Sequence, residues 1–61
     1  MENNDLPFKI VAISGETDEV LGLVATLILA KSIYRAAVII YPGRAIELRQ
    51  GGEVIEKHAA L

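Results

Sequence analysis

The longest run of apolar positions in the chain covers residues 20–30 and continues, with few polar interruptions, to Tyr41. On a period of 3.6 residues, one face of this run carries apolar side chains three and four residues apart: Val20, Leu23, Leu27, Ala30, Tyr34, Ala37 and Tyr41. A second apolar row lies beside the first, so roughly half of the circumference is apolar. The pattern therefore predicts one amphipathic helix of about 25 residues.

Both ends of this predicted helix carry residues that commonly begin or end helices. Ser14 or Thr17 could act as the N-cap, and three carboxylates nearby would complement the helix dipole: Glu16, Asp18 and Glu19. At the other end, Pro42 disfavours helical geometry at the residue before it, and Gly43 tolerates the positive φ of a turn. We therefore expect the helix to end at Tyr41.

A membrane-spanning helix is an alternative interpretation of the same run. A span needs about 20 consecutive apolar residues, and Lys31 interrupts this run after its first segment, with Arg35 one turn later. Each charge would cost roughly 2.5–3.5 kcal/mol in the hydrocarbon. The acidic segment 1–5 also differs from a signal peptide, which begins with basic residues. We therefore expect no membrane association.

Segments before and after the predicted helix have the composition of strands. Residues 8–13 are rich in strand-forming residues and apolar on both faces apart from Lys9, which predicts a central strand. Residues 44–49 alternate between apolar and charged side chains, and Gly51-Gly52 predicts a hairpin to a last strand at 53–58. Pairing Arg49 with Val54 keeps the apolar residues on one face, although it sets Glu47 opposite Glu56.

These elements predict an α/β (α+β) fold with the order β-α-β-β, in which one long helix packs on a small three-stranded sheet. The expected organisation is a disordered arm at residues 1–6, a single domain at 7–58 and a tail at 59–61. If residues 8–13 and 44–49 are parallel, the helix crosses between them in the right-handed sense. A helix of roughly 37 Å would then extend well beyond strands of about 20 Å.

The overhanging helix and the composition together predict a homodimer. A chain of 61 residues buries a small core, it has no cysteine for a disulfide, and 52% of its residues are hydrophobic, with a mean hydropathy of +0.41. A two-fold symmetric dimer, in which elements could be exchanged, would cover the surplus apolar surface. The residues expected at the dimer interface are Val20, Leu23, Leu27, Ile28, Tyr34 and Tyr41.

Four basic residues are candidates for contact with an anion or an acidic partner. They are Lys31, Arg35, Arg44 and Arg49. A basic stripe of this kind can bind a phosphate backbone, and a small nucleic-acid-binding or regulatory module is therefore the alternative function. The net charge of −2 argues against a nucleic-acid partner.

No catalytic, cofactor or metal-binding constellation is predicted. Ser14-Gly15 is a weak phosphate-binding signal beside three carboxylates, and those carboxylates match no cation-binding loop. His58 is the only histidine and has no nearby serine, cysteine or second ligand in the sequence. An enzyme would require a dimer cleft that gathers Tyr34, Glu56 and His58, so we expect a non-enzymatic protein.

The second half of the chain resembles short uncharacterised bacterial proteins of about this length. The resemblance covers residues 17–57 and rests on the segment 30–38, the aromatic-Pro turn Tyr41-Pro42-Gly43-Arg44 and the hairpin segment Leu48-Arg49-Gln50-Gly51. It implies a small cytoplasmic α/β protein, and it brings no activity and no functional residue with it. Independently of this resemblance, the surplus apolar surface predicts a homodimeric domain with a protein–protein interaction role.

Overall fold

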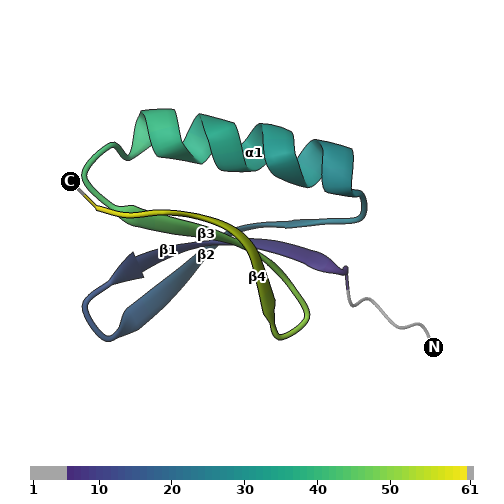
Figure 1. Ribbon diagram of the computed structural model, residues 1–61, viewed down its shortest axis with the longest axis horizontal. Coiled ribbons are helices and arrows are strands. Elements are labelled where there is room, and N and C mark those ends of the chain that lie inside the picture. Colours follow the sequence, from purple (N-terminus) through teal and green to yellow (C-terminus); the bar gives the residue numbers. More distant parts are fainter. Residues whose placement is uncertain (1–5, 61) are drawn as a thin grey trace.

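The structure, a computed structural model that describes residues 6–60, consists of two β-hairpins joined by one helix (Figure 1). The five elements are β1 (Phe8–Ser14), β2 (Thr17–Val24), α1 (Leu27–Ile40), β3 (Ala45–Gln50) and β4 (Glu53–His58). The strands form one antiparallel sheet in the order β2-β1-β3-β4. The helix covers one face of this sheet, which leaves the other face without a second layer among the described residues.

The predicted β-α-β-β order with three strands is wrong, because residues 17–24 form β2 instead of the first turns of the helix. The two-residue loop Gly15-Glu16 reverses the chain, and Gly15 adopts a φ of 64°, which is the backbone geometry of a tight hairpin turn. The segment after the loop contains Thr17, Val20 and Val24, which favour strands, and Gly22, which disfavours a helix. Pairing with the edge of β1 therefore outweighs the helical periodicity.

The extra strand also changes the direction of the sheet. β1 and β3 pair antiparallel, so the condition for a right-handed crossover, a parallel arrangement of these two strands, is not met. Because the first hairpin returns the chain to the end of the sheet where β1 began, the helix starts from that end and carries the chain back to the other end. β3 consequently runs opposite to β1, and no parallel crossover is needed.

The helix begins at Thr26, not at the predicted caps Ser14 or Thr17. Thr26 has extended backbone angles, and its Oγ1 accepts a hydrogen bond from the Leu29 amide at 3.3 Å. The helix ends as expected before Pro42-Gly43: the Tyr41 amide donates to the Ala37 carbonyl at 2.8 Å, and the Arg44 amide donates to the Tyr41 carbonyl at 3.1 Å. A β-turn therefore joins α1 to β3.

The shorter helix removes the predicted overhang. α1 has 14 residues, which corresponds to a length of about 21 Å, and the seven residues of β1 span about 23 Å. Helix and sheet are thus matched in length, as Figure 1 shows. Helix length therefore gives no reason for self-association, and only the side chains that the helix exposes can drive it.

The core lies between α1 and the sheet. The helix contributes Ala30, Tyr34 and Ala37, and the sheet contributes six side chains from β1, β2 and β3: Phe8, Ile10, Ala12, Val24, Ile46 and Leu48. Alanines at two of the three buried helix positions allow the helix axis to approach the sheet closely. The predicted central strand at residues 8–13 is confirmed, since β1 pairs with a strand on each side.

The predicted second hairpin is confirmed, with one correction to its register. Arg49 pairs with Val54 as expected, but a β-bulge follows, so that Glu47 lies opposite Lys57 and not opposite Glu56. The bulge replaces an unfavourable pair of carboxylates with a pair of opposite charges.

Three further expectations concern the membrane, the arm and the tail. Among residues 6–60, no helix is both long enough and apolar enough to span a bilayer. Residues 1–5 of the expected arm and residue 61 of the expected tail lie outside the described part of the chain. Ala59 and Ala60 follow β4 without regular secondary structure.

Candidate interaction surface

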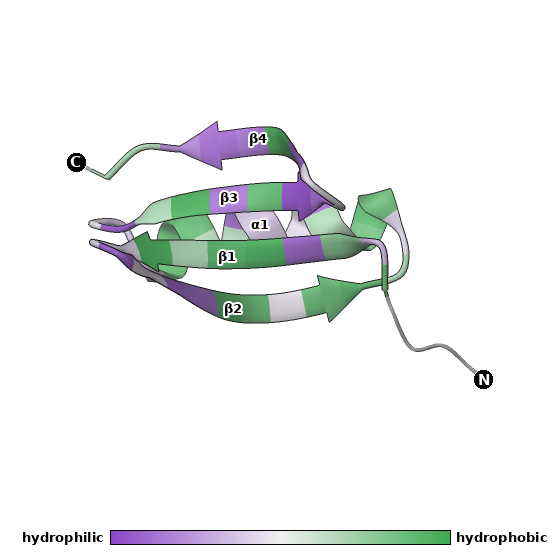
Figure 2. Cartoon of the chain, turned by 90° about the horizontal axis from the view of Figure 1, so that it is seen from below, coloured by the Kyte–Doolittle hydropathy of each residue, from purple (hydrophilic) through white to green (hydrophobic). Residues whose placement is uncertain are grey.

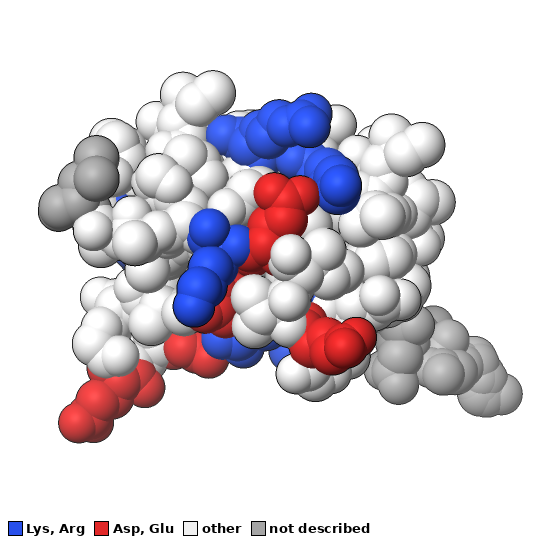
Figure 3. All heavy atoms as spheres, in the orientation of Figure 1, with Lys and Arg blue, Asp and Glu red and all other residues white. Residues whose placement is uncertain are grey.

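The side of α1 that faces away from the sheet is rich in exposed apolar side chains. Ile28 is 81% exposed, Ile39 77%, Ile40 64% and Leu29 54%. Ser32, Arg35 and Ala36 are exposed between them. We call these seven residues the outer helix face. In the space-filling view, uncharged atoms lie along the helix on both sides of a group of basic side chains (Figure 3).

The outer helix face is exposed because the sheet covers only one side of the helix. The buried positions Ala30, Tyr34 and Ala37 fall on one line of the helix, and successive residues rotate by about 100°. Ile28, Ser32, Arg35 and Ile39 therefore lie on the opposite line. Large aliphatic side chains exposed along one side of a helix are a candidate interaction site.

The structure divides the six predicted interface residues among three environments. Leu27 and Ile28 are exposed on α1. Val20 and Leu23 are exposed on β2 and pair with Val11 and Lys9, which places them on the sheet face away from the helix. Tyr34 is buried beneath the helix, and Tyr41 is half-buried. The structure therefore does not bring the six together on one surface.

The predicted interface omits three of the four large aliphatic residues of the outer helix face: Leu29, Ile39 and Ile40. It includes Tyr34, whereas the row of Ala30, Tyr34 and Ala37 is the one buried against the sheet. The small side chains in that row were the available signal, because alanine commonly lies where a helix packs closely on another layer. The large aliphatic residues on the opposite side of the helix then face away from the sheet, toward solvent or a partner.

Three of the four predicted basic contact residues have carboxylate neighbours within the chain. Lys31 Nζ lies 3.6 Å from Glu56, and Arg44 lies 3.1 Å from Glu19 with its guanidinium 5.5 Å from the centre of the Tyr41 ring. The Arg49 guanidinium is 2.7 Å from Glu47 and 3.3 Å from Asp18. Arg35 forms no salt bridge with any carboxylate of residues 6–60.

Figure 2 views the sheet from the side away from the helix, and its strands contain both hydrophilic and hydrophobic residues. Asp18 on β2 and Arg49 on β3 form their ion pair across β1, the strand between them, and Val11 of β1 is fully buried although it is not part of the core under the helix. Hydrogen bonding to Glu47 is the main cause that raises the pKa of Arg49 above its usual value. The ion pairs thus cover the centre of this face, and Val20, Leu23 and Val54 remain exposed around it.

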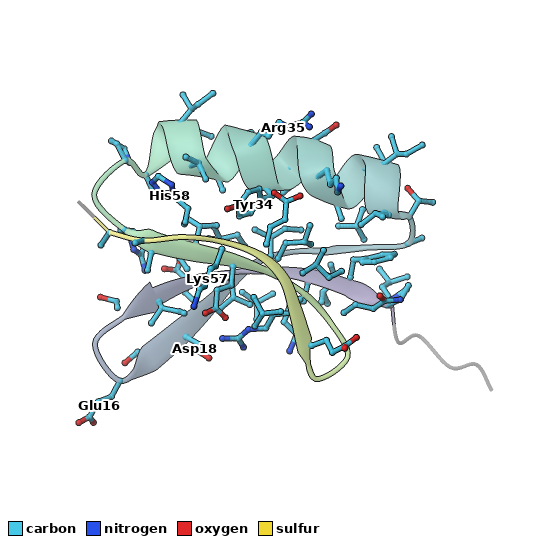
Figure 4. All side chains as sticks on the ribbon, in the orientation of Figure 1. Glu16, Asp18, Tyr34, Arg35, Lys57 and His58 are labelled. Atoms are coloured by element: carbon cyan, nitrogen blue, oxygen red, sulfur yellow. The ribbon has the colours of Figure 1, made fainter. Side chains whose placement is uncertain are left out.

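A groove of about 350 Å³ lies between α1 and β4, lined by Tyr34, Arg35, Val38, Ile39 and His58. In Figure 4, Tyr34 and His58 lie in the space between the helix and β4. Burial, together with the negative charge of Glu56, raises the pKa of the Tyr34 hydroxyl. The three residues that an enzyme would need are thus neighbours.

These three residues lie near one another without hydrogen bonds between their side chains in the described part of the chain. Glu56 is instead near Lys31. A general acid or base requires a partner that orients it and a substrate position within hydrogen-bond reach.

The acidic residues of the first hairpin are also spread out. Asp18 and Glu19 lie against arginines of other elements, and Glu16 lies at the tip of the hairpin (Figure 4). Residues 6–60 contain no group of three or more side chains placed to hold a metal ion. Ser14, the other half of the weak phosphate signal, ends a strand that continues into a hairpin, so it does not precede a helix.

No protein family, curated protein sequence or solved structure matches the chain. The resemblance to short bacterial proteins stays a prediction, and the function must be argued from the geometry of this molecule.

Proposed function

We propose that the chain is a non-enzymatic domain that acts through protein–protein contact, and that it does so as a homodimer. The observation that carries the proposal is the outer helix face, where four large aliphatic side chains are more than half exposed. A cytoplasmic location is part of the proposal and rests on the resemblance to short bacterial proteins.

The free energy available from burying this surface is comparable to the cost of association. Full burial of one isoleucine or leucine side chain contributes about 1.5–3 kcal/mol. Four partly exposed side chains from each of two protomers would together supply on the order of 10 kcal/mol. That lies within the range of about 4–15 kcal/mol that association costs in lost freedom of motion. The outer helix face can therefore sustain a dimer if neighbouring contacts add modestly to it.

The alternative function, binding of nucleic acid through a basic stripe, receives less support from the geometry. Lys31, Arg44 and Arg49 each lie beside carboxylates of the same chain, and neutralised side chains release few counterions from a phosphate backbone. Salt-sensitive binding of DNA or RNA by the purified protein would restore this alternative. Absence of binding at low salt would remove it.

Light scattering after size exclusion, over protein concentrations from about 1 µM to 1 mM, tests the proposal. We expect a mass of two chains at the upper end and a decrease toward one chain on dilution. A single-chain mass at every concentration, together with no binding of a dye that reports exposed apolar surface, would refute the proposed function.

A further inference from the structure

The outer helix face contains an uncharged stripe with two-fold symmetry in its side-chain sizes. The stripe consists of Ile28, Leu29, Ser32, Ala36, Ile39 and Ile40, all exposed. On a helix with about 100° per residue, these six positions lie within about 60° of a single line. Large aliphatic residues occupy its two ends, and small residues occupy its middle. Reversing the direction of the stripe therefore leaves its pattern of large and small side chains unchanged.

Both charged residues of the helix lie outside this stripe, on the flank next to β4. Lys31 reaches Glu56 of that strand, and Arg35 lines the groove that contains His58. The other flank contains Ala36 and Ile40, which line a shallow depression with Leu21 and Ile33 on the side of β2. The uncharged stripe thus continues toward β2 and is bounded by charge toward β4.

We propose that two copies of the chain associate through antiparallel packing of α1 on α1, with the two-fold axis passing between Ser32 and Ala36. This inference rests on the proposed homodimer and specifies its interface. In this arrangement Ile28 of one protomer lies against Ile39 of the other, and Leu29 lies against Ile40. The small residues at the middle allow the two helices to approach to the usual 8–10 Å.

The charges favour a second copy over a charged partner. A stripe with no charge offers no ion pair to an acidic or a basic surface, whereas a reversed second copy sets aliphatic side chains against aliphatic side chains at both ends. The two Arg35 side chains would lie on the rim, where their long stems can cover apolar surface and their guanidinium groups stay in water. The dimer would form four layers, with the two helices inside and the two sheets outside.

Disulfide trapping distinguishes antiparallel from parallel packing, and the absence of cysteine from the chain makes the test clean. Ile28 and Ile39 are eleven residues apart, about 16 Å along the helix. In the antiparallel dimer, two copies of the same residue are therefore too far apart for a disulfide, which needs Cα atoms about 4.4–6.8 Å apart. Ile28→Cys and Ile39→Cys would cross-link only with each other.

The experiment oxidises each variant alone and then an equimolar mixture, and identifies the products by intact mass. We expect a covalent heterodimer in the mixture and little product from either variant alone. Leu23→Cys, exposed on the opposite sheet face, mixed with Ile39→Cys is the matched control and should stay uncoupled. Efficient cross-linking of each variant with itself would overturn the antiparallel arrangement.

A second variant tests the interface without relying on cysteine. Ala36→Glu places a charge at the centre of the stripe on an exposed position, and we expect it to be monomeric wherever the wild type is dimeric. Ala59→Glu, also exposed and beyond β4, is the control and should dimerise normally. If Ala36→Glu dimerises as the wild type does, another surface forms the dimer and only the helix packing is refuted. A wild type that is monomeric at every concentration and binds no dye for exposed apolar surface would refute the proposed function itself.

Discussion

Shortening Ile39 to alanine separates the contribution of the outer helix face to association from its contribution to folding. The substitution removes three carbon atoms, each worth about 0.8 kcal/mol when it leaves water. Ile39 is 77% exposed in the protomer, so most of this free energy is gained only when a second chain covers it. Because each dimer contains two copies, Ile39→Ala should cost about 3–4 kcal/mol of association free energy. The dissociation constant should therefore rise by about 10²–10³-fold.

Sedimentation velocity over a dilution series measures this change, and urea unfolding of dilute samples measures the stability of the protomer. The protomer should keep its unfolding free energy to within about 0.5 kcal/mol, because Ile39 is exposed there. Leu23→Ala is the matched control, since it removes as many carbon atoms from an exposed leucine on the other side of the sheet. Our reasoning would be refuted if Ile39→Ala dimerised with wild-type affinity, or if the control weakened the dimer equally.

The partner of Ile39 can be identified with the same assay. If Ile28 contacts Ile39 of the other protomer, shortening either side removes the same contact. The double variant should then lose less association free energy than the sum of the two single losses, with a coupling of at least about 0.5 kcal/mol. Additive losses would indicate that the two residues do not meet in the dimer.

Three further predictions concern the fold. Thr26→Ala removes the acceptor of the Leu29 amide and should lower the unfolding free energy in urea by about 1 kcal/mol, whereas Thr26→Ser should preserve it. Gly15→Ala should lower the unfolding free energy by about 1–2 kcal/mol, because a φ of 64° is strained for any residue with a Cβ. An added Cβ would meet no atom within 4 Å, so the cost comes from the backbone alone. Gly43 is equally open but lies outside the left-handed region, so Gly43→Ala should be neutral in the same titration. The raised pKa of Tyr34 means that the folded state holds this proton more tightly, so stability should be complete below the unfolded pKa of about 10 and fall as the pH rises above it. Tyr34→Phe has no hydroxyl to titrate, so the loss of stability that Tyr34 causes at high pH should be absent. Urea unfolding of both proteins from pH 9 upward measures this difference in the pH dependence of the unfolding free energy.

Local patterns were sufficient where periodicity and chain-breaking residues agreed. The alternation of residues 44–49 and the Gly51-Gly52 turn predicted β3 and β4, and Pro42-Gly43 predicted the end of the helix. β1 was predicted as a central strand because both of its faces are apolar. In each of these segments, turn residues set where the element ends. The residue pattern between them was compatible with only one type of secondary structure.

The helix predicted over residues 17–24 was wrong because no turn signal there decided between a helix and a strand. Their apolar positions fit a helix that continues into α1, and the same positions also fit a strand. Gly15-Glu16 as a hairpin loop and Thr26 as an N-cap were the signals for a strand. Neither signal decides between helix and strand from the local sequence, because Ser14 and Thr17 are equally acceptable N-caps for a longer helix.

The sequence by itself determined the position of most elements and the surplus of apolar side chains, since both follow from residue type and spacing. Only the tertiary structure decided that β2 exists, that β1 and β3 are antiparallel, and which side of the helix is exposed. The free edge of β1 offers β2 a ladder of backbone hydrogen bonds, and this non-local pairing exceeds the small differences in intrinsic propensity. Because β2 pairs with β1, α1 is only as long as the sheet, and Ile28 and Ile39 face solvent.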